Sequence, residues 1–255
     1  MSFEYVDLKD ARTAGGVRMS VISGIPSPWS EAAKGILHIK RIDWKAVRHS
    51  PGDPELQGWT GCHNAPALVY NDEPFRSAWI DILLFAEHHS GEPKLVPEDA
   101  ETRALMLGLA HEFMGQDGLC WLRRLQLVHG GKQMQGPTRD HADYIASKYR
   151  YAAQDIPRGH NRIIELLHLF SSMLTRQKSV GLPYYIGDTP TALDIYSAVS
   201  MALFAPLPEE HCAMPPATRM AFGMIDEATR DSLAPVLLDH RDMMYERHLA
   251  LPLAL

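Results

Sequence analysis

Two serines stand where a helix could begin, and a helix start can hold an anion. Ser27 precedes Pro28, and proline suits the first helical position because the N–H it lacks would be unbonded there. Unbonded N–H groups at such a position favour an anion by about 0.3–2 kcal/mol, and a hydroxyl hydrogen bond adds to this. Ser77 precedes a second predicted helix. The alternative for both residues is an ordinary N-cap.

Other polar motifs indicate structure rather than chemistry. Thr191 and Asp194 have the Thr-x-x-Asp spacing of a capping box at a helix start. Pro66 opens an apolar strand, and from spacing alone a trans bond is expected, since cis is about 5% of X–Pro bonds. His111-Glu112 lacks the second histidine of a HExxH zinc motif, so no metal is expected.

These residues must be positioned by a mixed N-terminal part. We expect a polar leader over 1–16, followed by two helices beginning near Pro28 and Ser77. The apolar patterns predict strands over 17–23, 43–47, 65–70 and from 74, with helices over 28–40 and 78–88. The segment 48–63 is rich in proline, glycine and polar residues and is predicted to be irregular.

The rest of the chain has helical spacing. Gly91, Pro93 and Pro97 mark a boundary. Helices are predicted over 98–116, 119–129, 138–153, 158–178, 191–204 and 231–246. The expected domains are therefore a leader (1–16), an α/β domain (17–90), a linker (91–97) and an all-α domain (98–255).

Composition excludes several classes of protein. The net charge is −6 over 255 residues, and no lysine- or arginine-rich run occurs, so no nucleic-acid partner is expected. Apolar runs such as 80–86 are too short to cross a bilayer, and 1–10 lacks a signal-peptide layout, so we expect no membrane partner and a cytoplasmic protein. The three cysteines are scattered, which argues against a disulfide framework.

Four stretches, in order, resemble the cytosolic glutathione S-transferases. Ile-Pro-Ser-Pro-Trp-Ser at 25–30 is similar to the active-site turn, and Asn-Ala-Pro-Ala-Leu-Val at 64–69 to the strand whose proline is cis in the family. Phe-Arg-Ser-Ala-Trp-Ile at 75–80 resembles the turn that holds the glutamyl end of glutathione. The segment 185–195 is similar to the helical-domain signature Gly-Asp-x-Pro-Thr-x-Ala-Asp.

The resemblance implies a thioredoxin-like N-terminal domain, a helical C-terminal domain and glutathione as co-substrate. Ser27 would stabilise the glutathione thiolate, with Ser30 as the second candidate. The glutathione-binding residues implied by the match are Trp29, Ala65, Pro66, Arg76 and Ser77. The backbone of Ala65 would pair with the cysteinyl backbone of glutathione.

The implied activity is a transferase used in detoxification. A serine at position 27 cannot form the mixed disulfide of thiol–disulfide exchange, so thiol addition is favoured. A small apolar electrophile would lie between the domains, against the helices 98–116 and 119–129. The family also implies a homodimer. A glutathione-dependent isomerase or dehalogenase is a weaker alternative, since both use the same thiolate.

Arg76 departs from the family pattern, which usually has an acidic or glutamine residue at this place. Arginine has five donors and no acceptor, so it repels the glutamyl ammonium group and attracts a carboxylate. Three outcomes follow: Arg76 grips the carboxylate, Arg76 faces solvent, or glutathione binding is lost. The last outcome would leave a non-catalytic binding module with the same fold.

Overall fold

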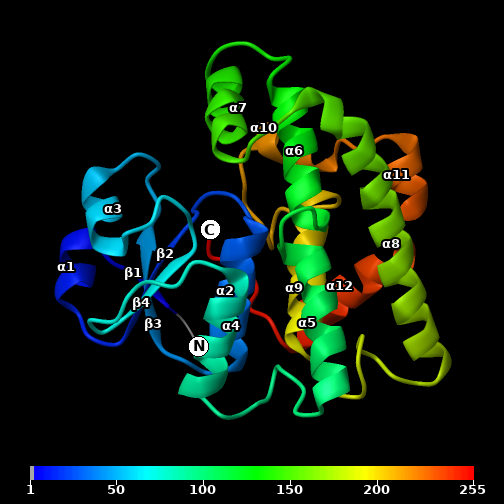
Figure 1. Cartoon of the computed structure of the whole chain (residues 1–255), viewed down its shortest axis with the longest axis horizontal. Coiled ribbons are helices and arrows are strands. Elements are labelled where there is room, and N and C mark those ends of the chain that lie inside the picture. Colours follow the sequence, from blue (N-terminus) through cyan, green and yellow to red (C-terminus); the bar gives the residue numbers. More distant parts are fainter. Residues whose placement is uncertain (1–2) are drawn as a thin grey trace.

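A four-stranded sheet forms the centre of the N-terminal half in this computed structural model, which describes residues 3–255 (Figure 1). The strands are β1 (Glu4–Tyr5), β2 (Val17–Val21), β3 (Trp44–Arg48) and β4 (Ala67–Tyr70). Their order is β1-β3-β2-β4; β1 and β2 are parallel to β3, and β4 is antiparallel to β2. All five residues of β2 are buried, including Arg18 and Ser20, which alternate with its apolar residues, so the weakly alternating pattern at 17–23 does belong to a buried strand.

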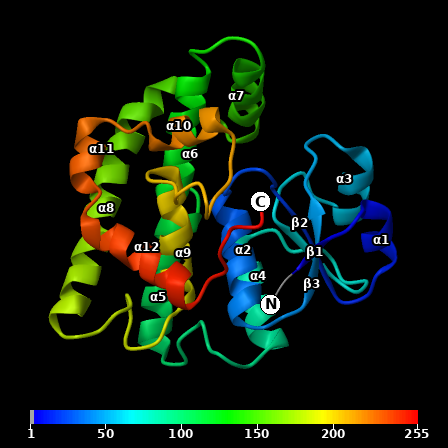
Figure 2. The same cartoon turned by 180° about the vertical axis from the view of Figure 1, so that it is seen from behind.

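Helices cover both faces of this sheet. On one side lie α1 (Leu8–Thr13) and α3 (Pro54–Thr60), where Ala11, Val47 and Leu56 form a small buried cluster. On the other side lie α2 (Pro28–Ile39) and α4 (Trp79–His89), between the sheet and the C-terminal helices (Figures 1 and 2). This places the start of α2 beside the C-terminal half.

The C-terminal half is a layer of helices against α2 and α4 (Figure 1). It contains α5 (Ala100–Met114), α6 (Leu119–Gly131), α7 (Pro137–Lys148), α8 (Ile156–Ser179), α9 (Ala192–Ser200), α10 (Pro216–Gly223), α11 (Glu227–Ser232) and α12 (Pro235–Arg247). Gly118 separates α5 from α6, and a Cβ at this position would lie 2.7 Å from two carbonyl oxygens of α5. Glycine therefore permits the tight junction between these helices.

The two halves share one apolar core. It extends from Met19 of β2 through Ile36 of α2 to Ile195 of α9. The expected linker takes part in it, since Leu95 is fully buried and its carbonyl accepts from the Ala192 N–H at 2.9 Å. Within residues 3–255 no helix is both long and apolar enough to cross a bilayer.

Three sequence predictions need correction. The leader at 1–16, whose first two residues lie outside the described part, contains β1 and α1 from Glu4 onward; two residues of strand are too few for periodicity to show. The irregular segment contains α3, because Asp53 accepts from two N–H groups of its first turn. The return strand from 74 is only a bridge between Leu68 and Arg76.

Helix ends were also misplaced in the C-terminal half. Most predicted ends shift by a few residues, and α10 and α11 were missed, being short segments of eight and six residues. The predicted capping box is confirmed at the start of α9, where Thr191 and Asp194 bond reciprocally. The α9 helix that begins here packs against α2.

Candidate functional site

The start of α2 is the first part of the candidate site. Ser27 is the N-cap residue in extended conformation, but its side chain makes no capping hydrogen bond. The residue is 4% exposed, and its hydroxyl oxygen is buried without a hydrogen-bond partner in the described part of the chain. A buried hydroxyl without a hydrogen bond destabilises the folded protein. A ligand that forms a hydrogen bond with this hydroxyl would remove that cost.

Ser30 has a different environment. It is fully buried, and its Oγ accepts from the Ile22 N–H at 3.1 Å. The bond ties the end of β2 to the first turn of α2. The hydroxyl of Ser30 is therefore already used by the fold, whereas that of Ser27 is not.

The loop before β4 supplies the second part of the site. The Ala65–Pro66 bond is cis, as in the resembling family and unlike the expectation from spacing alone. The backbone of half-buried Ala65 makes no hydrogen bond to the described residues. Ser77 donates its hydroxyl to the Pro66 carbonyl at 2.9 Å, and the N-cap of α4 is Ala78, not Ser77 as predicted.

Arg76 already has an acidic partner. Its Nη2 lies 2.7 Å from the Glu73 carboxylate, and its guanidinium stacks over the Phe85 ring at 4.9 Å. Together with Tyr70 and His89 these residues line a shallow cavity beside α4. The three outcomes predicted for Arg76 did not include this arrangement. In the structure, the guanidinium of Arg76 forms an ion pair with Glu73.

Trp29 connects the start of α2 to the helical half. Its Nε1 donates to the Met114 carbonyl at 2.9 Å, and the Arg124 guanidinium lies 4.0 Å from its ring centroid. Arg124 in turn donates to the Tyr149 hydroxyl at 2.7 Å. Nothing in the sequence singles out Arg124, because a charged residue at helical spacing is usually solvated.

Lys148 makes a second contact between the halves. Its Nζ donates to the His63 carbonyl at 2.9 Å, two residues before Ala65. Burial, and then the charge of Arg124, lower the pKa of Lys148. Sequence analysis missed this residue too. Arg124 and Lys148 thus place positive charge beside the loop that leads to Pro66.

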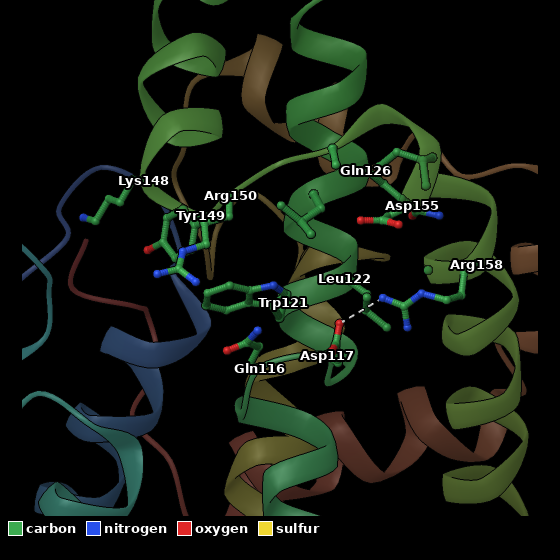
Figure 3. Close-up of a pocket in the computed structure, with 14 residues that line it drawn as sticks. Gln116, Asp117, Trp121, Leu122, Gln126, Lys148, Tyr149, Arg150, Asp155 and Arg158 are labelled. Carbon is green, nitrogen blue, oxygen red and sulfur yellow. Dashed lines mark hydrogen bonds and ion pairs between the residues drawn. The ribbon is translucent and has the colours of Figure 1, made fainter.

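A cavity of about 360 Å³ lies on the helical side of this junction (Figure 3). Its walls come from α6, the end of α7 and the start of α8, and include Trp121, Leu122, Tyr149 and Ile156. The rings of Trp121 and Tyr149 line this cavity, with centroids 4.9 Å apart. The helix predicted at 119–129 does border it.

His49, at the end of β3, makes stability near the site depend on pH. Burial, and then the charge of Lys148, lower the pKa of His49 below 6.5, and its Nδ1 is buried without a partner in residues 3–255. As pH falls below about 6.5 the unfolded chain takes up this proton first, so the free energy of unfolding decreases, by at most about 1.4 kcal/mol per pH unit. In His49→Gln, urea unfolding at pH 7.5 and 5.5 should differ less than in the unchanged protein. An equal difference in both proteins would show that His49 does not titrate in this way.

The described residues contain no group of three or more histidine, cysteine, aspartate or glutamate side chains arranged to hold a metal ion. The candidate site consists instead of a helix start, an open loop backbone and nearby cations. Such an arrangement suits an anionic organic ligand.

Comparison with known proteins gives structural neighbours only. Neither protein-family models nor curated proteins match the chain. A glutathione S-transferase from Methylobacterium radiotolerans, in complex with glutathione sulfonate, has a TM-score of 0.62 at 18% identity, over 90% of this chain and 91% of that one. One from Methylobacillus flagellatus with glutathione bound has a TM-score of 0.63 at 14% identity, over 91% and 96%.

One structural neighbour is an enzyme whose name states its reaction. The beta-etherase LigF from Sphingobium has a TM-score of 0.58 at 13% identity, over 89% of this chain and 99% of that one. The likeness in all three cases covers both halves of the chain. The protein therefore has the glutathione S-transferase fold, with a thioredoxin-like sheet domain followed by a helical domain.

Proposed function

We propose that the protein is a glutathione transferase-like enzyme that adds the glutathione thiolate to a small electrophile with an apolar body. The cysteinyl sulfur would lie at the start of α2 beside Ser27, and the peptide would extend along Ala65 toward Ser77. The observation that carries the proposal is the Ser27 hydroxyl, which is buried and unbonded within residues 3–255 at a helix N-terminus. Neighbours of the same fold bind glutathione or its sulfonate, which supports it.

The chemistry needs a stabilised thiolate. A free thiol has a pKa of about 8.5, and each unit by which it is lowered needs about 1.4 kcal/mol of preference for the anion. The N–H groups of α2 and the Ser27 hydroxyl would supply this preference. After the thiol proton leaves to solvent, the thiolate forms a sulfur–carbon bond, and the leaving group departs with the bonding electron pair.

A second candidate is a non-catalytic binding module. The Ser27 oxygen is covered by protein atoms, and none of the cavities at α4, at α6–α8 or beside the C-terminal tail is lined by Ser27, Pro66 or Ser77. Catalysis therefore requires side chains around Ser27 to move when glutathione binds. In a binding module that no longer binds glutathione, the Ser27 hydroxyl would stay covered.

A melting titration separates the two candidates. Glutathione at about 100 times its dissociation constant should stabilise the fold by roughly 2.7 kcal/mol and raise the melting temperature. The matched control is γ-glutamyl-alanyl-glycine, which lacks the sulfur and should give a smaller shift. No shift at millimolar glutathione would favour the non-catalytic module.

Two further proposals follow from the family resemblance, a homodimer and a role in detoxification. A cytoplasmic location is proposed from the sequence pattern alone. Light scattering of the purified chain tests the first. The division into domains at 91–97 also stays a prediction.

A further inference from the structure

Positive charge gathers at one end of the cavity between α6, α7 and α8. Lys148, Tyr149 and Arg150 lie at the end nearest α2, and Lys148 points toward the N-terminal half (Figure 3). Arg124 is joined to this group through its hydrogen bond to Tyr149. Within the described part of the chain, no carboxylate forms an ion pair with any of the three cations Arg124, Lys148 and Arg150.

The acidic residues of the cavity lie at its other end. Asp117 is paired with Arg158 at 3.4 Å, and Asp155 is beside them (Figure 3). The charges are therefore separated along the cavity, and its acids do not neutralise the cations near α2. Lys148 and Arg124 are both half-buried, and this burial lowers the pKa of each.

Arg150 is held in an uncommon backbone conformation. Its φ of 51° is in the left-handed region, which costs a non-glycine residue of the arginine type about 1 kcal/mol. Arg150 is solvent-exposed and makes no hydrogen bond to any described residue, and it lines the cavity just beyond the end of α7. The strained turn thus presents an unpartnered guanidinium to the cavity, and arginine binds carboxylates through two parallel hydrogen bonds.

Aromatic walls lie next to these cations in the cavity. The rings of Trp121 and Tyr149 meet edge to face, with Leu122 and Ile156 beside them. A ring of benzene size can lie against such walls, with its plane along Trp121. A volume of about 360 Å³ suits a ligand of this size.

We infer that this cavity binds an aromatic carboxylate, with the ring against Trp121 and Tyr149 and the carboxylate toward Arg150 and Lys148. The inference deepens the proposed function by naming the class of the electrophilic co-substrate, an aryl compound that carries an anionic group. This assignment of the co-substrate rests on the proposed function. Ser27 does not line the cavity, so transfer to a ligand bound here also requires the side chains around Ser27 to move.

The carboxylates of glutathione could bind the same cations as the carboxylate of an aryl ligand. Lys148 bonds to the His63 carbonyl, close to the loop along which glutathione would lie. The experiment must therefore separate a co-substrate carboxylate from a glutathione carboxylate. Unreactive ligands and two variants make this possible.

The binding of 3-nitrobenzoate and of its methyl ester is measured by quenching of tryptophan fluorescence, without glutathione. The two ligands differ only in the charge of one group. The carboxylate should bind at least about tenfold more tightly, since a hydrogen bond to a charged group is worth about a factor of ten or more. Arg150→Asn, which keeps a residue that tolerates positive φ, should remove most of this preference, and Lys148→Gln should reduce it.

The matched control is Arg139→Asn on α7, the helix that ends just before Arg150, because Arg139 is paired with Asp143 and does not line the cavity. It should leave the preference unchanged, and Arg150→Lys should restore part of what Arg150→Asn loses. Thermal melting of each variant checks that it is folded. Equal binding of acid and ester by the unchanged protein would overturn the inference.

Separate titrations with glutathione distinguish the two proposals. If glutathione fails to bind but 3-nitrobenzoate binds with the expected preference, the proposed function fails and the aryl-carboxylate site stands. If Arg150→Asn weakens glutathione binding and leaves the acid-to-ester preference unchanged, the cations serve glutathione and the inference is wrong.

Discussion

Asp194→Ala is expected to destabilise the protein by about 3–5 kcal/mol, the largest effect foreseen for a single substitution. Asp194 is fully buried; its Oδ2 accepts from the Thr191 N–H at 2.8 Å, and its Oδ1 accepts from the Tyr185 N–H at 3.0 Å. His240 Nε2 lies 3.0 Å from the same Oδ1. Alanine would leave these buried donors without an acceptor.

Urea unfolding of purified Asp194→Ala measures the loss. Asp188→Ala is the matched control, because Asp188 is exposed in the preceding turn and should change the free energy of unfolding by no more than about 0.5 kcal/mol. A loss below about 1 kcal/mol in Asp194→Ala would contradict the account of this junction. Since α9 packs against α2, the same variant tests how strongly the helical half supports the candidate site.

Ser27→Ala is expected to raise the pKa of the bound glutathione thiol by roughly one to two units. A hydrogen bond to a charged group is worth about 1.5–3 kcal/mol, and one pKa unit is about 1.4 kcal/mol. At pH values below the thiol pKa of the unchanged complex, the rate of thiol addition should fall about 10- to 100-fold. Ultraviolet absorbance of the thiolate, followed against pH in the glutathione complex, measures the shift directly.

Ser30→Ala is the matched control for this experiment. It removes the hydrogen bond to the Ile22 N–H and should lower the free energy of unfolding by about 1 kcal/mol, without moving the thiol titration. A titration that moves in Ser30→Ala and stays unchanged in Ser27→Ala would reverse the assigned roles. An unchanged titration in both variants would leave the α2 backbone as the only source of stabilisation.

The elements that hold the candidate site could be predicted from sequence because their signals are local. The alternating apolar residues of β2, the proline at the start of α2 and the Thr191–Asp194 capping box each lie within one short stretch. The sheet's first strand could not be found in this way. Glu4–Tyr5 is a strand only because β3 pairs with it, and that contact is distant along the chain.

The charged part of the site was missed for a related reason. Arg124 and Lys148 lie on helices where charged residues normally face solvent, and their contacts with Trp29 and His63 join the two halves of the chain. The cover over Ser27 was also unforeseen. Spacing indicates that Ser27 begins α2, but it does not show that the folded chain buries the hydroxyl of Ser27.

The most direct test of a thiolate site at the start of α2 is a crystal structure of the protein soaked or co-crystallised with glutathione. The account predicts that the cysteinyl sulfur lies within hydrogen-bond distance of Ser27 Oγ, with the cysteinyl backbone paired to Ala65. A bound glutathione whose sulfur lies elsewhere, with Ser27 still covered, would contradict it.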